Sequence, residues 1–244
     1  MHVVKDSSMK QQEEGEINMQ DSEGQVKPAG KQWFIRWLIY LAGMVVLAFG
    51  ITLNTKTGLG VSPIISIAYS VSQIWELNFG NTTLALYCLL VVAQFVIRRK
   101  NRRWTDLLQV PVALLVSQLL NLFDYLLDIQ LASFWWNLLL LIAAILLTGL
   151  GVVLSVNMRL VPNPGDGIVQ AISDETGKGL GLTKNLFDVG CILCSVAIGL
   201  IFAGKLVGIG LGTILAVLGV GRAVALFNRL LKENMLRAAG LEKK

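Results

Sequence analysis

The sequence has little charge and almost no histidine. Of its 244 residues, 15% are Asp, Glu, Lys or Arg, and the single histidine is His2, near the first residue. A histidine proton relay or a histidine-bound metal inside a membrane is therefore excluded. A Gly-rich phosphate loop of the ATPase type is also absent, so any coupling to ATP would have to come from a partner protein.

Cysteine is scarce as well. The three cysteines, Cys88, Cys191 and Cys194, all lie inside apolar segments. Cys191 and Cys194 form a Cys-x-x-Cys, but a helix in lipid offers no charge to stabilise a thiolate, and no second pair completes a metal site. We therefore expect these cysteines to pack, and we expect no cofactor or metal. Because no nucleophile and base stand at a usable spacing, we also expect no enzyme activity.

The chain is instead rich in apolar residues. Hydrophobic residues make up 54% of it and the mean hydropathy is +0.63, values typical of an integral membrane protein. Its net charge of +5 does not indicate a nucleic-acid partner, because the cations cluster at the ends of apolar segments, as is typical of membrane topology. The lipid bilayer is the first partner that the sequence predicts.

Six apolar segments are long enough to cross a bilayer as helices. They occupy about residues 33–53, 82–97, 104–125, 134–156, 182–203 and 208–230. Two further apolar segments, residues 63–77 and 164–174, are shorter, since 15 residues of helix reach only about 22 Å against a hydrocarbon core of about 30 Å. We expect both to enter the membrane and return, with spanning left open as the alternative.

The placement of cations favours re-entry of the short segments. With six crossings, the N-terminus, the cluster at residues 98–103 and the basic C-terminal segment fall on one side, leaving chiefly Lys56 and Lys205 on the other. Because cytoplasmic loops are enriched in Lys and Arg, both termini are predicted to be cytoplasmic. Residues 1–30 are polar and aperiodic, which is typical of a disordered tail and not of a signal peptide.

The second half of the chain repeats the order of elements in the first. A shift of 101 residues pairs Gly50 with Gly151 and Pro63 with Pro164. Each half contains a crossing, a broken turn, a short helix and two more crossings. Because three is an odd number, the two halves must insert with opposite orientations, as inverted repeats of secondary transporters do. A chance match within generic membrane composition is the alternative.

The predicted fold is all-α, with six transmembrane helices in two inverted three-helix repeats, each having a short re-entrant helix after its first crossing. The predicted divisions are a disordered tail at 1–30, repeats at 31–128 and 129–231, and a basic cytoplasmic tail at 232–244. In a bilayer, backbone that leaves a helix persists only where it is buried in protein or lines a wet cavity. The two broken turns are therefore the predicted functional site.

Six residues at the broken turns are predicted to bind a substrate. Helices that start near the midplane would present free N–H groups and positive dipole ends, which suit an anionic or polar solute. The six are Ser62, Pro63, Ser66, Asn163, Pro164 and Asp166. Asp166 is the strongest candidate because an acid inside a membrane is costly unless paired or hydrated, although a carboxylate that caps the turn is the alternative.

Two charges in the last two crossings complete the predicted site. Asp188 lies one to two turns into the fifth crossing, and Arg222 lies inside the sixth. An ion pair of Arg222 with Asp166 or Asp188 would lower the cost of both charges, in a structural or a transport role. Gln109 in the third crossing faces the same interior or bonds a neighbouring helix. The Gly-rich sixth crossing permits close helix contact, within the chain or in a homodimer.

Three short motifs stand in a fixed order along the chain: GLGVSP at 58–63, PGDG at 164–167 and GLGT at 210–213. In these motifs the sequence resembles the YczE/YitT-type bacterial integral membrane proteins, a class without an established biochemical function, over most of residues 35–230. Asn163 stands where that group usually has glycine, and Asp188 where it usually has glutamate. The resemblance implies a bacterial cytoplasmic-membrane protein and leaves the substrate open.

The leading hypothesis is a secondary permease or exporter of a small polar or anionic solute, in which the two repeats give alternating access to the site. Two alternatives stay open. One is a substrate-binding membrane subunit that works with a separate ATPase, and the other is a non-transporting scaffold or regulator of a membrane enzyme. The expected partners are lipid, an unidentified small solute and, in the dimeric alternative, a second copy of the chain.

Overall fold

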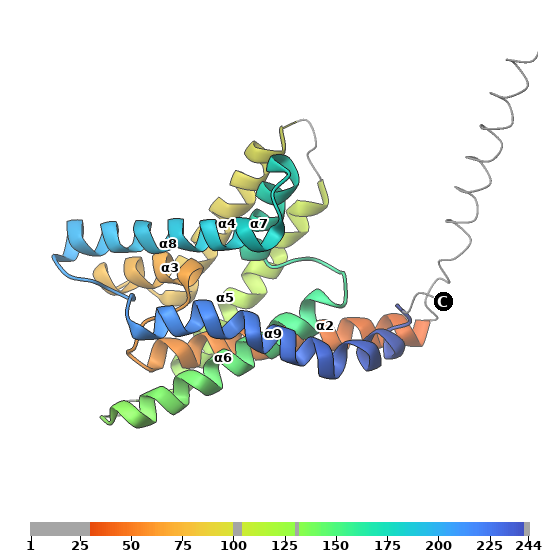
Figure 1. Ribbon diagram of the computed structural model, residues 1–244, viewed down its shortest axis with the longest axis horizontal. Coiled ribbons are helices and arrows are strands. Elements are labelled where there is room, and N and C mark those ends of the chain that lie inside the picture. Colours follow the sequence, from red (N-terminus) through yellow and green to blue (C-terminus); the bar gives the residue numbers. More distant parts are fainter. Residues whose placement is uncertain (1–29, 100–103, 130–131, 242–244) are drawn as a thin grey trace, which may run out of the picture.

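The computed structural model describes residues 30–99, 104–129 and 132–241, and its regular structure there is entirely helical (Figure 1). The elements are α2 (Gly30–Lys56), α3 (Pro63–Ile74), α4 (Phe79–Arg98), η2 (Trp104–Leu108), α5 (Gln109–Leu126), α6 (Phe134–Val156), α7 (Pro164–Thr176), α8 (Leu180–Ala203) and α9 (Leu211–Ala238). Six of the described helices are long and apolar enough to cross a bilayer, with η2 and α5 counted as one. The chain is thus a multi-pass membrane protein.

The expected crossings and short helices are all present. Both short helices begin at the predicted prolines, Pro63 and Pro164, because a first turn has no use for the N–H that proline lacks. The sixth crossing differs from the prediction, since α9 continues to Ala238 and Met235 is buried in the main core. Residues 232–238, predicted as tail, therefore belong to a helix. The predicted tail at 1–30 lies outside the described residues, except for Gly30 at the start of α2.

The helices α2 and α6 form a closely packed central pair. A Cβ added at Gly50 would lie 2.6 Å from the backbone N of Thr148, and one added at Gly151 would lie 2.5 Å from the backbone N of Leu47. Residue numbers fall along α6 as they rise along α2, so the two helices are antiparallel. Small residues allow such close backbone approach, which maximises van der Waals contact between membrane helices.

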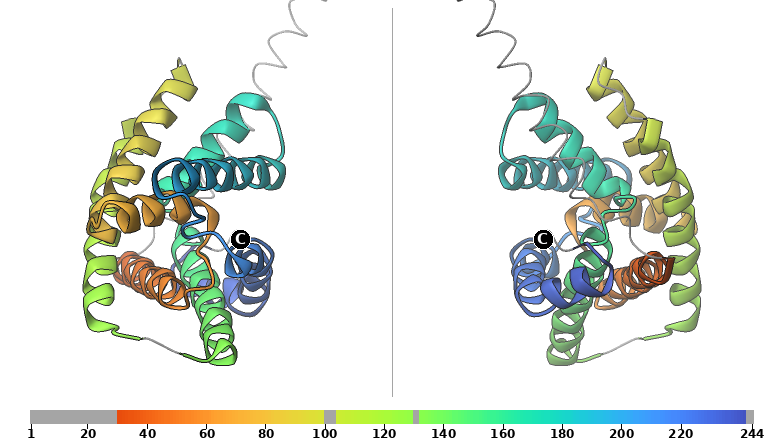
Figure 2. Two further views of the ribbon diagram at one scale, coloured as in Figure 1. Left: turned by 90° about the vertical axis from the view of Figure 1, so that its left-hand side faces the viewer. Right: turned by 90° about the vertical axis from the view of Figure 1, so that its right-hand side faces the viewer.

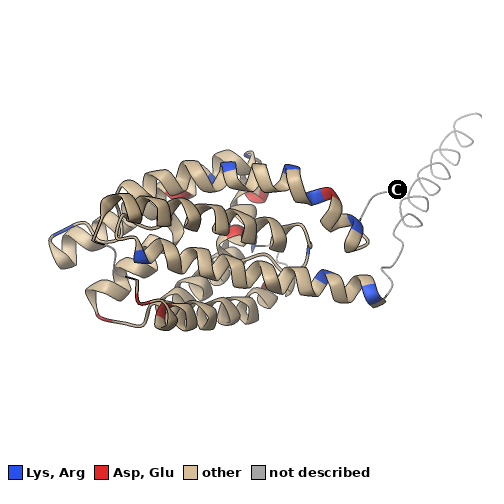
Figure 3. Cartoon of the chain, turned by 90° about the horizontal axis from the view of Figure 1, so that it is seen from below, with Lys and Arg blue, Asp and Glu red and all other residues tan. Residues whose placement is uncertain are grey.

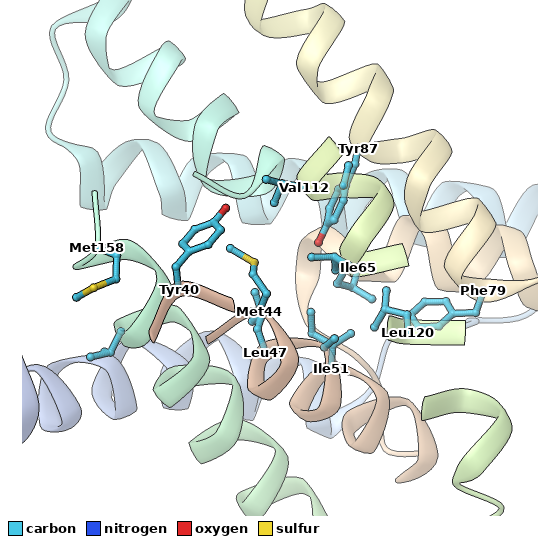
Figure 4. Close-up of a cluster of buried hydrophobic side chains, with 14 of the residues drawn as sticks. Tyr40, Met44, Leu47, Ile51, Ile65, Phe79, Tyr87, Val112, Leu120 and Met158 are labelled. Atoms are coloured by element: carbon cyan, nitrogen blue, oxygen red, sulfur yellow. The ribbon is translucent and has the colours of Figure 1, made fainter. Parts of the chain in front are cut away.

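The other long helices flank this pair. α5 packs on α2 and α9 packs on α6, so the α4–α5 pair and α9 lie on opposite sides of it (Figure 2). The main core lies between α2 and its neighbours, where Met44 lies beside Tyr40 and Leu120 lies beside Phe79 (Figure 4). Outward-facing apolar side chains such as Leu89 and Leu193 remain exposed, as expected of surfaces that face lipid.

Contacts between helix ends define two faces of the molecule. On one face the start of α2 meets the end of α6, where Arg36 donates to the carbonyl oxygens of Met158 and Arg159. On the other, Lys56 near the end of α2 forms a 2.7 Å ion pair with Asp124 near the end of α5. We call these the α2-start face and the α2-end face. Lys and Arg gather toward the α2-start face, where the end of α9 also lies (Figure 3).

The broken turn after α2 forms backbone hydrogen bonds with the segment just before α9 and with the first turn of α9. The Val61 N–H donates to the Gly208 carbonyl over 2.9 Å, and the Gly212 N–H donates to the Leu59 carbonyl over 2.7 Å. Gly60 lies between these bonds with φ +107°, and a Cβ there would lie 2.6 Å from the backbone of the same segment. Two of the three motifs noted in the sequence thus meet backbone to backbone.

The α2–α6 contact predicts different effects for two alanine substitutions. Gly151→Ala is expected to destabilise the fold because the new methyl group overlaps the backbone of α2, and overpacking costs about 1–3 kcal/mol. Gly221→Ala in α9 is the matched control, since nothing lies within 4 Å of that position. Thermal unfolding of both variants in detergent measures the difference. Equal loss of stability in the two would contradict the close contact.

Candidate functional site

The first turns of α3 and α7 meet inside the helix bundle. Their N-cap residues, Ser62 (φ −62°, ψ 150°) and Asn163 (φ −60°, ψ 140°), share an extended conformation. A Cβ added at Gly165 in α7 would lie 3.3 Å from Cδ1 of Ile64 in α3. The two breaks predicted as one site therefore lie side by side, although 101 residues separate Pro63 from Pro164.

From this junction the two short helices lead to opposite faces. Trp75, just after α3, packs against Phe202 near the end of α8, with ring centroids 5.1 Å apart. Asp174 in the last turn of α7 lies 3.4 Å from Arg98, the last residue of α4. Arg98 also pairs with Asp106 just before α5, over 3.5 Å. Because α5 ends at the α2-end face, its start lies at the α2-start face, and the end of α7 lies there too. The end of α3, beside the end of α8, lies at the α2-end face.

Each short helix packs on a long helix from the other half of the chain, α3 on α8 and α7 on α4. In the first contact, Ser195 donates to the carbonyl oxygen of Ser66 over 3.1 Å. In the second, Nε2 of Gln94 lies 3.5 Å from the carbonyl oxygen of Pro164. The predicted residue Ser66 uses its own hydroxyl within the turn, donating to the Pro63 carbonyl over 2.6 Å.

A buried amide pair supports α7. Gln94 and Gln109 donate to each other through their amide groups, over 3.0 and 2.9 Å, and neither has measurable exposure. Gly167 of α7 makes room for them, since a Cβ there would lie 2.6 Å from Oε1 of Gln109. Of the two roles that the sequence left open for Gln109, this geometry matches the bond to a neighbouring helix.

Tyr87 of α4 reaches the junction of the two short helices. Its hydroxyl points toward Ile65 of α3 (Figure 4) and lies 3.5 Å from Nδ2 of Asn163, which donates to it. The other amide atom of Asn163, Oδ1, accepts the N–H of Gly165 over 3.2 Å. Asn163, a predicted site residue, is thus the N-cap of α7, and its hydrogen bond to the Tyr87 hydroxyl holds the amide in place.

The first turn of α3 is not capped in this way. The Ser62 side chain makes no capping hydrogen bond, and Pro63 has no N–H. Within the described part of the chain, no acceptor meets the N–H groups of Ile64 and Ile65. The start of α3 therefore keeps free donors at the positive end of its helix dipole, next to the first turn of α7.

Three charged residues of α7 and α8 lie beside the junction. Asp188 is 6% exposed; its Oδ2 lies 3.5 Å from Nζ of Lys184, while its Oδ1 is buried without a hydrogen-bond partner among the described residues. Asp166, in the first turn of α7, forms no hydrogen bond or ion pair within those residues. Its side chain keeps some accessible surface.

Arg222 lies away from these residues. It is exposed on α9, and it forms no ion pair within the described ranges, so the expected pair with Asp166 or Asp188 is not present. Lys184, one turn before Asp188, is the paired cation instead. No group of three His, Cys, Asp or Glu side chains that could hold a metal ion occurs in the same ranges.

Sequence reasoning missed Tyr87 and Gln94 as parts of the site. Neither stands out in an apolar helix, because tyrosine and glutamine often pack or bond between neighbouring helices. The shift of 101 residues carries the missing signal, since it pairs Tyr87 with Asp188 and Gln94 with Ser195. Because Asp188 is a candidate from the sequence, the repeat could have pointed to Tyr87, whereas the contact of Ser195 with α3 is visible only in the structure.

Comparison with known proteins identifies a family without a known activity. Residues 34–229 match the family of unknown function DUF6198. The chain is similar to two Bacillus subtilis (strain 168) proteins, the uncharacterized membrane protein YczE (26% identical, over 77% of this chain and 82% of that one) and the uncharacterized protein YyaS (24% identical, over 83% and 96%). No solved structure matches. The resemblance to YczE-type membrane proteins is thereby confirmed, and the chain belongs to the DUF6198 family.

Proposed function

We propose that the protein is a secondary permease or exporter that moves a small polar solute across the membrane by alternating access. The observation that carries the proposal is the contact between the first turns of α3 and α7, two short helices that leave their junction toward opposite faces. In many transporters, broken helices of this kind place free backbone groups at the bilayer midplane, where the solute binds.

The α2–α6 contacts support an arrangement of two inverted repeats. Under the shift of 101 residues, the pair Gly50 and Thr148 becomes the pair Gly151 and Leu47, and both pairs are close backbone contacts. Pairs that exchange in this way are the expected result of a two-fold axis between the helices. Because the helices are antiparallel, that axis crosses them, lies in the membrane plane and gives the halves opposite topologies.

The junction of the short helices lies on the same axis in this proposal. Ile64 and Gly165 are 101 residues apart, so the contact between them is its own image under the shift. A site on the axis is equally related to both repeats. Rocking one repeat against the other then opens the site first to one face and next to the other.

The charges at the junction favour a neutral or zwitterionic solute over an anion. The first turn of α3 offers free N–H donors, while Asp166 and the Oδ1 atom of Asp188 offer acceptors. The single cation among the described groups at the junction, Lys184, is already paired with Asp188, and Arg222 lies on an exposed surface. An anionic solute would therefore meet an excess of negative charge.

A ligand screen tests the proposed function. Thermal unfolding of the detergent-purified protein is measured against neutral polar solutes, amino acids and anions, and stabilisation is expected from the first two classes. A ligand at 100 times its Kd stabilises the fold by about 2.7 kcal/mol. Asp166→Asn is expected to lose the shift. Asp124→Asn is the control and is expected to keep it, since its carboxylate pairs with Lys56 at the α2-end face.

Each outcome of the screen distinguishes the hypotheses. Uptake of the stabilising solute into proteoliposomes would support a permease, and a folded protein that binds and moves nothing would contradict it. An ATPase that co-purifies from native membranes and is required for uptake would favour the membrane-subunit alternative. An Asp166→Asn variant with altered stability and unaltered ligand affinity would favour a scaffold.

Labelling of single cysteines tests whether the short helices re-enter the membrane. In a background in which Cys88, Cys191 and Cys194 are replaced by alanine, a cysteine is placed at Leu77 after α3 or at Lys178 after α7, both exposed. If both helices re-enter, a membrane-impermeant thiol reagent labels the two positions from opposite sides. Labelling of both from one side would show that the short helices span, and would contradict the inverted repeats.

A further inference from the structure

The broken turn after α6 brings two arginine residues together at the α2-start face. Arg36 of α2 donates through Nε to the carbonyl oxygen of Met158 over 2.6 Å and through Nη2 to that of Arg159 over 2.8 Å. Its guanidinium carbon lies 5.0 Å from the centre of the Trp33 ring. Because a guanidinium group carries five N–H donors, these bonds orient Arg36 and leave donors open for another acceptor.

Arg159 has an unpaired charge and an unfavourable backbone conformation. The residue is exposed, and its side chain forms no hydrogen bond or ion pair within the residues that the structure describes. Its φ is +49°, in the left-handed region that residues other than glycine and asparagine rarely adopt. The conformation costs stability and the side chain returns none to the turn, which points to a role in binding.

The helix α9 adds positive charge at the same end of the bundle (Figure 3). Nδ2 of Asn157 donates to Oδ1 of Asn228 over 2.8 Å, and Arg229 follows directly. Arg229 and Lys232 are exposed, and neither is paired with an acid in the described part of the chain. The turn itself, residues 157–163, contains no acidic residue. An excess of positive charge of this kind attracts an anionic partner.

An aromatic and apolar stripe of α2 continues from these charges into the membrane. Trp33, Trp37, Leu41 and Val45 follow one another at intervals of four residues along one side of the helix, and each is exposed. Tryptophan is enriched where the hydrocarbon meets the lipid headgroups. Arg36 lies between the two tryptophans and is therefore at headgroup depth, while Leu41 and Val45 lie deeper, beside the acyl chains.

We propose that the broken turn after α6 binds the phosphate group of an anionic phospholipid. Arg36 and Arg159 donate to the phosphate oxygens, and the acyl chains lie along the stripe from Trp37 to Val45. Guanidinium groups bind phosphate well because their planar N–H donors form paired, charge-assisted hydrogen bonds. The absence of an acidic residue from the turn disfavours a headgroup that carries its own cation, and the apolar stripe favours a lipid over a soluble anion.

A bound phosphate group has a structural effect at this position. It offsets the repulsion between two like charges and joins the start of α2 to the turn that leads into α7. The lipid thereby supports the start of a short helix from outside the bundle. This binding does not depend on the proposed function, because a protein that moves no solute can still bind the lipid.

Thermal unfolding of the detergent-purified protein tests the lipid site. Phosphatidylglycerol is the probe, phosphatidylcholine is the reference lipid without net charge, and inorganic phosphate is the soluble anion. Phosphatidylglycerol is expected to stabilise the wild-type protein more than either of the others. Arg159→Asn is expected to weaken the binding of phosphatidylglycerol by about tenfold or more, because charge-assisted hydrogen bonds are lost.

The same variant separates binding from folding. Asparagine tolerates the left-handed backbone conformation, so Arg159→Asn is expected to be at least as stable as the wild type in phosphatidylcholine. Lys178→Gln is the matched control, since Lys178 is an exposed cation beyond the end of α7 at the same face. This variant is expected to keep the wild-type affinity for phosphatidylglycerol.

Three results would overturn the proposal. Equal effects of phosphatidylglycerol and phosphatidylcholine on the wild type would remove the selectivity for an anionic headgroup. Equal losses of affinity in Arg159→Asn and Lys178→Gln would show a diffuse attraction to the basic face in place of a site. Stabilisation by inorganic phosphate that matches that of the lipid and disappears in Arg159→Asn would assign the turn to a soluble anion.

Discussion

The need to bond every peptide group inside a membrane is the constraint on which the rest of this structure depends. Backbone that leaves a helix in hydrocarbon finds no water, so its N–H and C=O groups need partners within the protein. The break after α2 obtains them from the backbone before α9. The break after α6 obtains them from side chains of α2, where Tyr40 donates to the Val161 carbonyl over 2.8 Å and Arg36 donates to that of Met158. Contacts between remote segments therefore fix the position of the junction.

The two breaks are alike where the short helices start and differ in their free polar groups. Their N-caps share one backbone conformation, and each precedes a proline that starts a short helix. One start is capped by Asn163, which leaves carboxylates nearby as the free polar groups, whereas the start at Ser62 leaves its N–H groups open. A repeated backbone with donors on one side and acceptors on the other can hold a polar molecule in one orientation. Duplication provides the symmetric framework, and substitutions within it provide the selectivity.

Features with a local cause could be predicted from the sequence, and those that depend on facing surfaces could not. The length of apolar runs predicted six crossings, and Pro63 and Pro164 marked the starts of the short helices. The side of a helix on which a polar residue lies is a property of the bundle. Arg222 was therefore expected inside and lies outside, while Gln94 was not noticed. The end of α9 at Ala238 was missed because its last turns are polar and are held by packing against α2.

Each short helix packs on a long helix of the other half of the chain, and this packing has a consequence for synthesis. The hydroxyl groups of Ser70 in α3 and Ser195 in α8 lie 2.7 Å apart, yet 125 residues separate them. A ribosome that adds about 5–20 residues per second takes on the order of 6–25 s to cover that distance. During this interval α3 is in or near the membrane without the helix on which it packs, whereas α7 emerges when α4 is already in place. The first half can therefore reach its final structure only after the second half has been inserted.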